Sequence, residues 1–433
     1  MNTIAAISTP YGVGGIAVIR MSGDEAVAIA SRLVGKPLTK PVQFCRVKDL
    51  DDLVVTVFHA PQSFTGEDQV EVACHGSLYL QQEILHRLLD LGAQAAKAGE
   101  FTQRAFLNGK LDLTEAEAVA DLIASRSKAE KDLALSHLRG GVSSEIQSLR
   151  DQLLEFTSLI ELELDFADHE DLQFADRSRL NDLCQRIESR LTALVASFRT
   201  GNAIKQGIPV AIVGAANAGK STLLNALLGD ERAIVSDIAG TTRDTVEDTL
   251  VIDGILFRLI DTAGLRETTD CVEQLGITRS LRAMEQAAVI LQVIDSTTPV
   301  LSSFTLRDGQ QLLRLYNKAD LLSPSATREQ DALYISAATG DLADLRERLS
   351  QIAQTLLQPL TSGVCISSAR HYEALQRALT AIRTVRQGLQ DGLGGELLTL
   401  DLHDCLNALG EITGQITSDE VLANIFSKFC IGK

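Results

Sequence analysis

The sequence predicts a multidomain protein in which an α+β domain precedes a helical domain that has an α/β domain inserted into it. Three observations predict this organisation. The 433 residues suffice for about two to four domains of ordinary size. Short β-type runs near the start give way to long amphipathic helices. Residues 209–229, PVAIVGAANAGKSTLLNALLG, then predict a buried strand, a glycine-rich loop and a helix, which is how an α/β domain begins.

The first domain is predicted to span residues 1–118. Runs of β-type residues at 16–19, 53–58 and 70–74 are separated by turns rich in Gly and Pro, as short strands usually are. Residues 79–91 instead carry apolar side chains at helical spacing. Several strands with a helix among them predict a compact α+β domain.

The second domain is predicted to be helical and discontinuous. Residues 119–206 are typical of long amphipathic helices, and the helical pattern returns in residues 361–433. Between them, residues 207–360 alternate strands and helices, which favours a mostly parallel sheet with helices on both faces. We therefore expect the α/β domain to be inserted into a helical domain whose two halves pack together.

The charge balance excludes broad, unspecific binding to nucleic acid or to an anionic membrane. The chain has 40 Lys and Arg against 57 Asp and Glu, a formal net charge of -17. Phosphate groups attract cationic surfaces, and the sequence contains no basic tail or block. The acidity limits how a nucleic acid is held but does not exclude one as a substrate.

The cysteines and the first residues predict the compartment. Seven scattered cysteines without a Cys-x-x-Cys pair are typical of free thiols in a reducing cytoplasm. The opening MNTIAAISTPYGVGG lacks the basic and long apolar regions of a signal peptide. No segment offers the roughly 20 apolar residues that span a bilayer. We expect a cytoplasmic protein without a membrane partner.

A phosphate-binding loop is predicted at residues 214–221, GAANAGKS, which fit G-x-x-x-x-G-K-[ST] between a strand and a helix. The glycines permit backbone N–H groups and the helix N-terminus to face phosphates. Lys220 is expected to reach the β- and γ-phosphates, and the Ser221 hydroxyl to bind Mg²⁺. Lys220 is therefore a candidate catalytic residue.

Three further motifs follow in order and identify the nucleotide. Residues 261–264, DTAG, end a predicted strand and supply a carboxylate and a glycine amide for magnesium and the γ-phosphate. Residues 317–320, NKAD, are a guanine-binding pattern, because the Asp320 carboxylate accepts from both N1–H and N2–H₂ of guanine, donors that adenine lacks. Residues 336–338, SAA, add a backbone amide for the guanine oxygen. Together the motifs predict a Ras-like P-loop domain that binds GTP.

Hydrolysis also requires an aligned water and a positive counter-charge on the transition state. Ras-type GTPases place Gln directly after the D-x-x-G motif, where this chain has Leu265, so another residue must orient the water. Glu273 is a candidate, with an exposed helical acid as the alternative. Within residues 236–244, SDIAGTTRD, either Thr241 or Thr242 can supply a second Mg²⁺ ligand.

Several segments resemble those of one family. NAGKS, DIAGTTRD, DTAGLR and NKAD are similar to segments of the GTPases that include Era and MnmE. More specific are Cys-Ile-Gly-Lys at 430–433, SFTGED at 63–68, CHG at 74–76 and GEFTQRAFLNGKLD at 99–112, which resemble the MnmE (TrmE) family of tRNA-modification GTPases over the full chain. One departure is Ala-Ala after the first P-loop glycine, where the family usually has Arg-Pro or a similar pair.

The resemblance implies an enzyme that acts with an FAD-dependent partner, MnmG (GidA), on the wobble uridine of certain tRNAs. The pair would add a carboxymethylaminomethyl or aminomethyl group at C5, with a one-carbon unit from 5-formyl- or 5,10-methylene-tetrahydrofolate. The first domain would bind the folate and form a homodimer, which joins MnmG in a heterotetramer or larger complex. The family's folate-contacting positions correspond to Arg20, Glu71, Lys110 and Lys433.

The resemblance also implies that a bound K⁺ replaces an arginine finger when two G domains meet. The implied K⁺ ligands are Asn217, Ser236, Ile238 and Thr241. The GTP-binding set is Asn217, Ala218, Gly219, Lys220, Ser221, Thr222, Ser236, Asp237, Ile238, Ala239, Gly240, Thr241, Thr242, Asp261, Thr262, Ala263, Gly264, Asn317, Lys318, Ala319, Asp320, Ser336, Ala337 and Ala338.

Three assignments of role depend on the same resemblance. Ser221 and Thr242 would bind Mg²⁺, and Glu273 matches the family's water-positioning glutamate. Cys430 would have a role in the active centre, where nearby lysines lower a thiol pKa; the alternative is a small residue packed in a turn. His75 is either a hydrogen-bond partner in the first domain or an ordinary buried histidine.

A second class of function is an Era-like ribosome-assembly switch that acts by binding alone. Such a factor needs a KH-like or other basic RNA-binding segment, and the sequence shows none. The folate-type segments of the first domain and the Cys-Ile-Gly-Lys tetrapeptide would also have no purpose in it.

Overall fold

The computed structural model describes residues 2–165, 176–229, 248–260, 282–300, 305–323, 332–357, 363–427 and 429–432. Contacts divide the chain into two compact units, and each is treated by itself below. The first comprises Met1–Ile123, His137–Ile187 and Arg377–Lys433; the second comprises Ala124–Ser136 and Glu188–Gln376. Among the described residues, no helix combines the length and apolar character of a membrane span.

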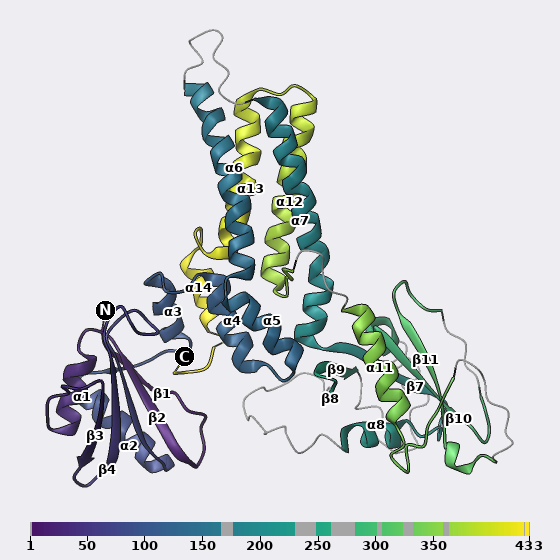
Figure 1. The fold of residues 1–433 in the computed structure, drawn as a ribbon, viewed down its shortest axis with the longest axis horizontal. Coiled ribbons are helices and arrows are strands. Elements are labelled where there is room, and N and C mark those ends of the chain that lie inside the picture. Colours follow the sequence, from purple (N-terminus) through teal and green to yellow (C-terminus); the bar gives the residue numbers. More distant parts are fainter. Residues whose placement is uncertain are drawn as a thin grey trace. The chain divides into compact units, whose positions relative to one another are not determined.

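The first unit contains a six-stranded sheet of order β3-β4-β5-β2-β1-β6 with α1 and α2 on one face (Figure 1). Neighbouring strands are antiparallel except for the parallel pair β1–β6. The bounds are β1 Ile4–Ile7, β2 Gly14–Ser22, α1 Ala26–Val34, β3 Val42–Val47, β4 Asp51–Phe58, β5 Gln69–Gly76, α2 Leu78–Asp90 and β6 Gln94–Ala95. The predicted strands and helix of this region are confirmed.

Strand β5 shows how the sequence assigns side chains to the two faces of this sheet. Val70 and Val72 are fully buried toward the helices, because successive side chains of a strand alternate between faces. Glu71 and His75 therefore lie on the opposite face. The strand register places Arg20 of β2 directly beside Glu71. Two predicted folate positions thus meet although they are far apart in the sequence.

The helical part consists of long helices from both sides of the α/β segment. Helices α6 and α13 pack side by side, so the prediction that the two halves pack together is confirmed (Figure 1). Their close approach depends on Gly395, where a Cβ atom would lie 3.1 Å from Ile160. The bounds are α3 Glu100–Leu107, α4 Leu113–Ala124, α5 Lys128–Leu138, α6 Gly141–Asp165, α7 Arg177–Gln206, α12 Ala369–Gln390, α13 Gly395–Thr413 and α14 Asp419–Phe426.

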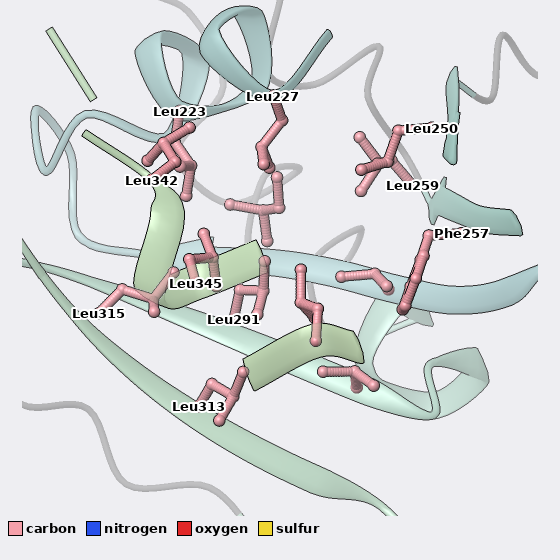
Figure 2. Close-up of a cluster of buried hydrophobic side chains, with 14 of the residues drawn as sticks. Leu223, Leu227, Leu250, Phe257, Leu259, Leu291, Leu313, Leu315, Leu342 and Leu345 are labelled. Atoms are coloured by element: carbon pink, nitrogen blue, oxygen red, sulfur yellow. The ribbon is translucent and has the colours of Figure 1, made fainter. Parts of the chain in front are cut away.

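The second unit contains a six-stranded sheet of order β12-β11-β10-β7-β9-β8, parallel except for the β8–β9 hairpin. Figure 2 shows Leu223 and Leu227 of α8 and Leu345 of α11 gathered over Leu291 in the core of this sheet. The bounds are β7 Ile208–Gly214, α8 Lys220–Gly229, β8 Asp248–Ile252, β9 Ile255–Ile260, β10 Val289–Asp295, β11 Gln311–Asn317, β12 Leu333–Tyr334 and α11 Ala343–Leu356, with a 3₁₀ turn at Ala319–Leu321.

The strand order determines where polar residues gather. Strands β7, β10 and β11 are parallel neighbours, so their carboxyl ends meet at one edge of the sheet. These ends are Gly214, Asp295 and Asn317, and the predicted phosphate and guanine motifs begin there. Ligands of open α/β sheets bind in this position, beyond the carboxyl ends of the strands.

The turn of the β8–β9 hairpin contacts the first turn of α5. Asp253 and Gly254 both adopt left-handed backbone angles, φ 50° and 77°, as a two-residue type I′ turn requires. The Gly254 oxygen accepts a 3.0 Å hydrogen bond from the Ala129 N–H, one of the donors that a helix start leaves unpaired. A Cβ atom on Gly254 would lie 3.0 Å from the Lys128 Cβ. The hairpin is thereby fixed at its turn.

Candidate functional site

The loop between β7 and α8 has the backbone of a phosphate-binding loop. Asn217 and Gly219 have left-handed φ angles of 63° and 97°, and such turns direct successive N–H groups toward an anion. Lys220 begins α8, and its Nζ donates to the oxygens of Gly214 at 3.0 Å and Ala215 at 2.8 Å. Burial lowers the pKa of Lys220. The amine lies over the loop, where phosphate oxygens can replace the two carbonyls.

Asn317 joins the phosphate loop to the guanine motifs. It ends β11 and is only 3% exposed. Its Nδ2 donates to the Ala218 oxygen at 3.0 Å, and its Oδ1 accepts from the Ala337 N–H at 3.0 Å. A Cβ atom on Gly219 would lie 2.2 Å from that Nδ2, so the loop glycine is required for this contact. One buried amide therefore ties three predicted motifs together.

Asp320 is presented to solvent in a fixed orientation. Its side chain is exposed, and its Oδ1 accepts a 2.6 Å hydrogen bond from the buried Ser336 hydroxyl. The backbone beneath is also held, because the Ala319 N–H donates to the Ile335 oxygen at 3.0 Å. The carboxylate that is expected to bind guanine is thus oriented before a base arrives.

Lys318 forms an ion pair that the sequence analysis missed. Its Nζ donates to Asp295 Oδ2 at 2.5 Å, while Asp295 Oδ1 accepts from the N–H and the hydroxyl of Thr297 at 2.9 and 2.6 Å. Hydrogen bonds from Lys318 and Thr297 lower the pKa of Asp295 to about 2. An acid at the end of the apolar strand VILQVID, beside the P-loop strand, was the signal available in the sequence.

The predicted GTP-site residues fall into two groups. The contacts above join the phosphate loop, NKAD and SAA motifs, whose described members are Asn217, Ala218, Gly219, Lys220, Ser221, Thr222, Asn317, Lys318, Ala319, Asp320, Ser336, Ala337 and Ala338. Outside the described residues lie Ser236, Asp237, Ile238, Ala239, Gly240, Thr241, Thr242, Asp261, Thr262, Ala263, Gly264 and Glu273. The second Mg²⁺ ligand, three K⁺ ligands and the water-positioning residue therefore stay predictions.

In the first unit, Arg20 and Glu71 form a pair with unused polar atoms. Arg20 Nε and Nη2 donate to Glu71 Oε1 at 3.0 and 2.8 Å, and Gln69 Nε2 lies 3.4 Å from the same oxygen. Among the described residues, Arg20 Nη1 and Glu71 Oε2 have no hydrogen-bond partner. The rings of Phe64 and Phe101 each lie 5.9 Å from the guanidinium carbon of Arg20. The pair thus offers one donor and one acceptor side by side.

Lys110 contacts the segment that contains Phe64. Its Nζ donates to the Pro61 oxygen at 3.0 Å, and its stem covers Gly66, where a Cβ atom would lie 3.2 Å from Lys110 Cγ. Phe64, which lies between Pro61 and Gly66 in the sequence, contacts Arg20. A hollow of about 460 Å³ lies alongside, lined by Asp24, Ala60, Gly66, Glu67, Asp68 and Asn108.

The tail around Cys430 lies against the first sheet and the start of α3. The Gly99 N–H donates to the Cys430 oxygen at 3.4 Å, and the Ser8 hydroxyl donates to the Gly432 oxygen at 3.2 Å. Two residues beyond Gly99, Phe101 contacts Arg20. Cys430 is exposed among the described residues, and its role in an active centre stays a prediction. The neighbouring lysines, at 428 and 433, lie outside the described residues.

His75 is not an ordinary buried histidine. Its side chain is 72% exposed, and its Nδ1 lies 2.8 Å from Asp51 Oδ1. The His75 backbone N–H also donates to Asp51 Oδ2 at 2.8 Å. Burial raises the pKa of Asp51, but hydrogen bonds from His75 and from the Asp52 N–H together outweigh it and lower that pKa below its ordinary value. His75 is therefore a hydrogen-bond partner of Asp51, and it lies on the same face of the sheet as Glu71.

A phosphate loop after β7 and an asparagine–lysine–aspartate set after β11, on parallel strands that flank β10, define a guanine-nucleotide-binding P-loop domain. Family models agree: one described as the MnmE helical domain matches residues 113–430, and one described as the GTP-binding protein TrmE N-terminus matches residues 3–110. The chain belongs to the MnmE (TrmE) family.

Full-length relatives support the same assignment. A protein named tRNA modification GTPase MnmE from Parabacteroides distasonis is 48% identical over 464 residues, which cover 100% of both chains. Proteins of the same name from Porphyromonas gingivalis and Flavobacterium psychrophilum are each 47% identical, and the matches cover 100% of this chain and 98% and 99% of theirs.

Proposed function

We propose that this protein is a cytoplasmic GTPase that acts with an FAD-dependent MnmG partner and a tetrahydrofolate in the modification of tRNA wobble uridines. The observation that carries the GTPase assignment is the Asn317 contact, which joins a phosphate loop to a fixed guanine-type carboxylate. The tRNA assignment rests on the full-length relatives named for that activity. The homodimer and the division at residues 118, 206 and 360 belong to the same proposal.

The deciding experiment is mass spectrometry of tRNA nucleosides from cells that lack the protein. We expect unmodified wobble uridines, restored by the wild-type gene but not by a Lys220→Ala variant, because Lys220 is the amine that contacts the phosphates. Wild-type nucleosides together with accumulated ribosome precursors would instead establish the Era-like assembly switch.

The described residues suit Mg²⁺-bound GTP. Lys220 and the loop N–H groups would bind the phosphates, and the Ser221 hydroxyl, in the first turn of α8, would ligate the metal ion together with Thr242. Bound Mg²⁺ would neutralise charge on the phosphate oxygens. Glu273 would position the attacking water. Asp320 and Lys318 would select and hold the base.

Asn217 is the described member of the proposed K⁺ site. It is exposed and left-handed within the phosphate loop, so its carboxamide oxygen is free to complete a cation shell beside the phosphates. We expect GTP turnover to rise steeply in KCl over NaCl, and Asn217→Ala to abolish the difference. Asn225→Ala, an exposed asparagine of the adjacent α8, is the matched control and should keep it. Equal wild-type rates in both salts would contradict the cation mechanism.

The Arg20–Glu71 pair supports the proposed folate site. A folate offers carboxylates that suit Arg20 Nη1 and Lys110, and pterin donors that suit Glu71 Oε2. The flanking rings of Phe64 and Phe101 add apolar surface for a flat ligand. Lys433 and Cys430 would approach from the tail.

Calorimetric titration with 5-formyltetrahydrofolate tests this site. We expect Arg20→Ala to weaken binding about tenfold or more, because a charged hydrogen-bond donor is lost. Arg46→Ala removes an exposed arginine that is paired with Asp52 on the neighbouring strands, and it should bind as the wild type does. No binding heat for the wild-type protein would remove the folate assignment.

A further inference from the structure

Asp295 occupies a position that connects the phosphate loop strand to the guanine motif. It ends β10, which pairs with β7 on one side and β11 on the other. The register places it directly beside Asn317, the residue that precedes Lys318. The Ser296 N–H donates to the Asn317 oxygen at 3.0 Å, which continues this pairing past the strand end.

Both carboxylate oxygens of Asp295 are used, so the group cannot rotate away. Oδ1 accepts two hydrogen bonds from Thr297, and Oδ2 accepts one from Lys318 Nζ. The Asp295 side chain is 17% exposed and that of Lys318 is 34% exposed. A ligand can therefore reach this partly exposed ion pair, while its own hydrogen bonds keep the two side chains in place.

Lys318 is constrained at both ends. Its backbone is left-handed, φ 64°, between the buried Asn317 and the exposed Asp320. Its ammonium is bound to Asp295, so the four-carbon stem between these points is held at both ends. A free lysine loses much rotamer freedom when a ligand immobilises it. Because Asp295 already restricts Lys318 in the unbound protein, less conformational entropy is lost when a ligand binds.

We infer that Asp295 is a positioning residue for guanine recognition that acts through Lys318: it holds the lysine stem in place as one wall of the base pocket. A lysine stem is apolar and its head is cationic, and both suit the face of a flat purine ring. The inference rests on the proposed GTP site. It adds a residue outside the four nucleotide motifs.

Stopped-flow binding of a fluorescent GDP analogue, combined with steady-state GTP turnover, tests the role. Asp295→Asn keeps the size of the side chain and an acceptor for Thr297 but turns an amide toward Lys318. We expect GDP affinity to fall about tenfold, mainly through faster dissociation, and KM for GTP to rise while kcat stays within about twofold. Asp253→Asn, in the left-handed β8–β9 turn that asparagine tolerates, is the matched control and should change neither.

A double-mutant cycle separates positioning from general support of the fold. In a Lys318→Met background, Asp295→Asn should cause no further loss of GDP affinity, because its effect passes through the missing ammonium. Additive losses, or unchanged affinity in Asp295→Asn alone, would overturn the inference. A wild-type protein that fails to bind GDP would instead overturn the proposed function, so the two failures are distinguishable.

Discussion

Asp320→Asn is expected to change the nucleotide specificity of the site from guanine to xanthine. The carboxylate accepts from two guanine donors, and each hydrogen bond to a charged group contributes about 1.5–3 kcal/mol, so GDP affinity should fall on the order of 100-fold or more. Ser336 can still donate to the asparagine oxygen, which leaves the amide N–H₂ toward the base. Xanthine carries a carbonyl where guanine carries an amino group, and it accepts from that amide.

Competition of GDP and xanthosine diphosphate against a fluorescent nucleotide measures the exchange. Asp344→Asn, an exposed acid in the first turn of α11, is the matched control and should leave both affinities unchanged. GDP affinity that is the same in Asp320→Asn and in the wild type would mean that Asp320 does not contact the base.

Gly219→Ala is expected to abolish nucleotide binding. The residue has φ 97°, which side chains rarely adopt, and the new Cβ would lie 2.2 Å from Asn317 Nδ2. Asn317 would have to release Ala218 or Ala337, and each buried group left unpaired costs about 1–3 kcal/mol. We therefore expect a loss of GDP affinity on the order of 100-fold and a lower melting temperature.

Two further variants make this prediction specific. Gly229→Ala, at the end of α8 with nothing within 4 Å of the new methyl group, should bind GDP normally. Combining Gly219→Ala with Asn317→Ala should lose less than the sum of the two single effects, because both act on one contact. Wild-type affinity in Gly219→Ala would show that the Asn317 contact is dispensable.

Local patterns predicted most of the elements that carry the site. The strand that was predicted to end at the DTAG motif is β9, Ile255–Ile260, and the P-loop motif lies between β7 and α8 as expected. The α/β segment was predicted because strand–loop–helix patterns are encoded in short stretches. Strands β1 and β3 and helix α1 were not predicted; their runs are only four, six and nine residues long.

Contacts between residues far apart in the chain could not be predicted from local sequence patterns. Nothing in the local pattern indicates that Arg20 and Glu71, 51 residues apart, are register partners. Their pairing depends on how two strands align. Only the resemblance to a family predicted that both residues belong to one site. Asp295 was missed for a related reason: its partner Lys318 is 23 residues away, and an acid after a strand is ordinarily a turn residue.

The α5 contact of the β8–β9 turn has a mechanical consequence for the nucleotide site. In sequence, the hairpin joins the DIAGTTRD motif to the DTAG motif, while its turn is tethered to the Ala129 N–H. A one-residue slip of either strand would turn every side chain to the other face, so the hairpin cannot slide along its neighbour β7. The hairpin therefore connects both motifs in sequence to a fixed contact with the first turn of α5.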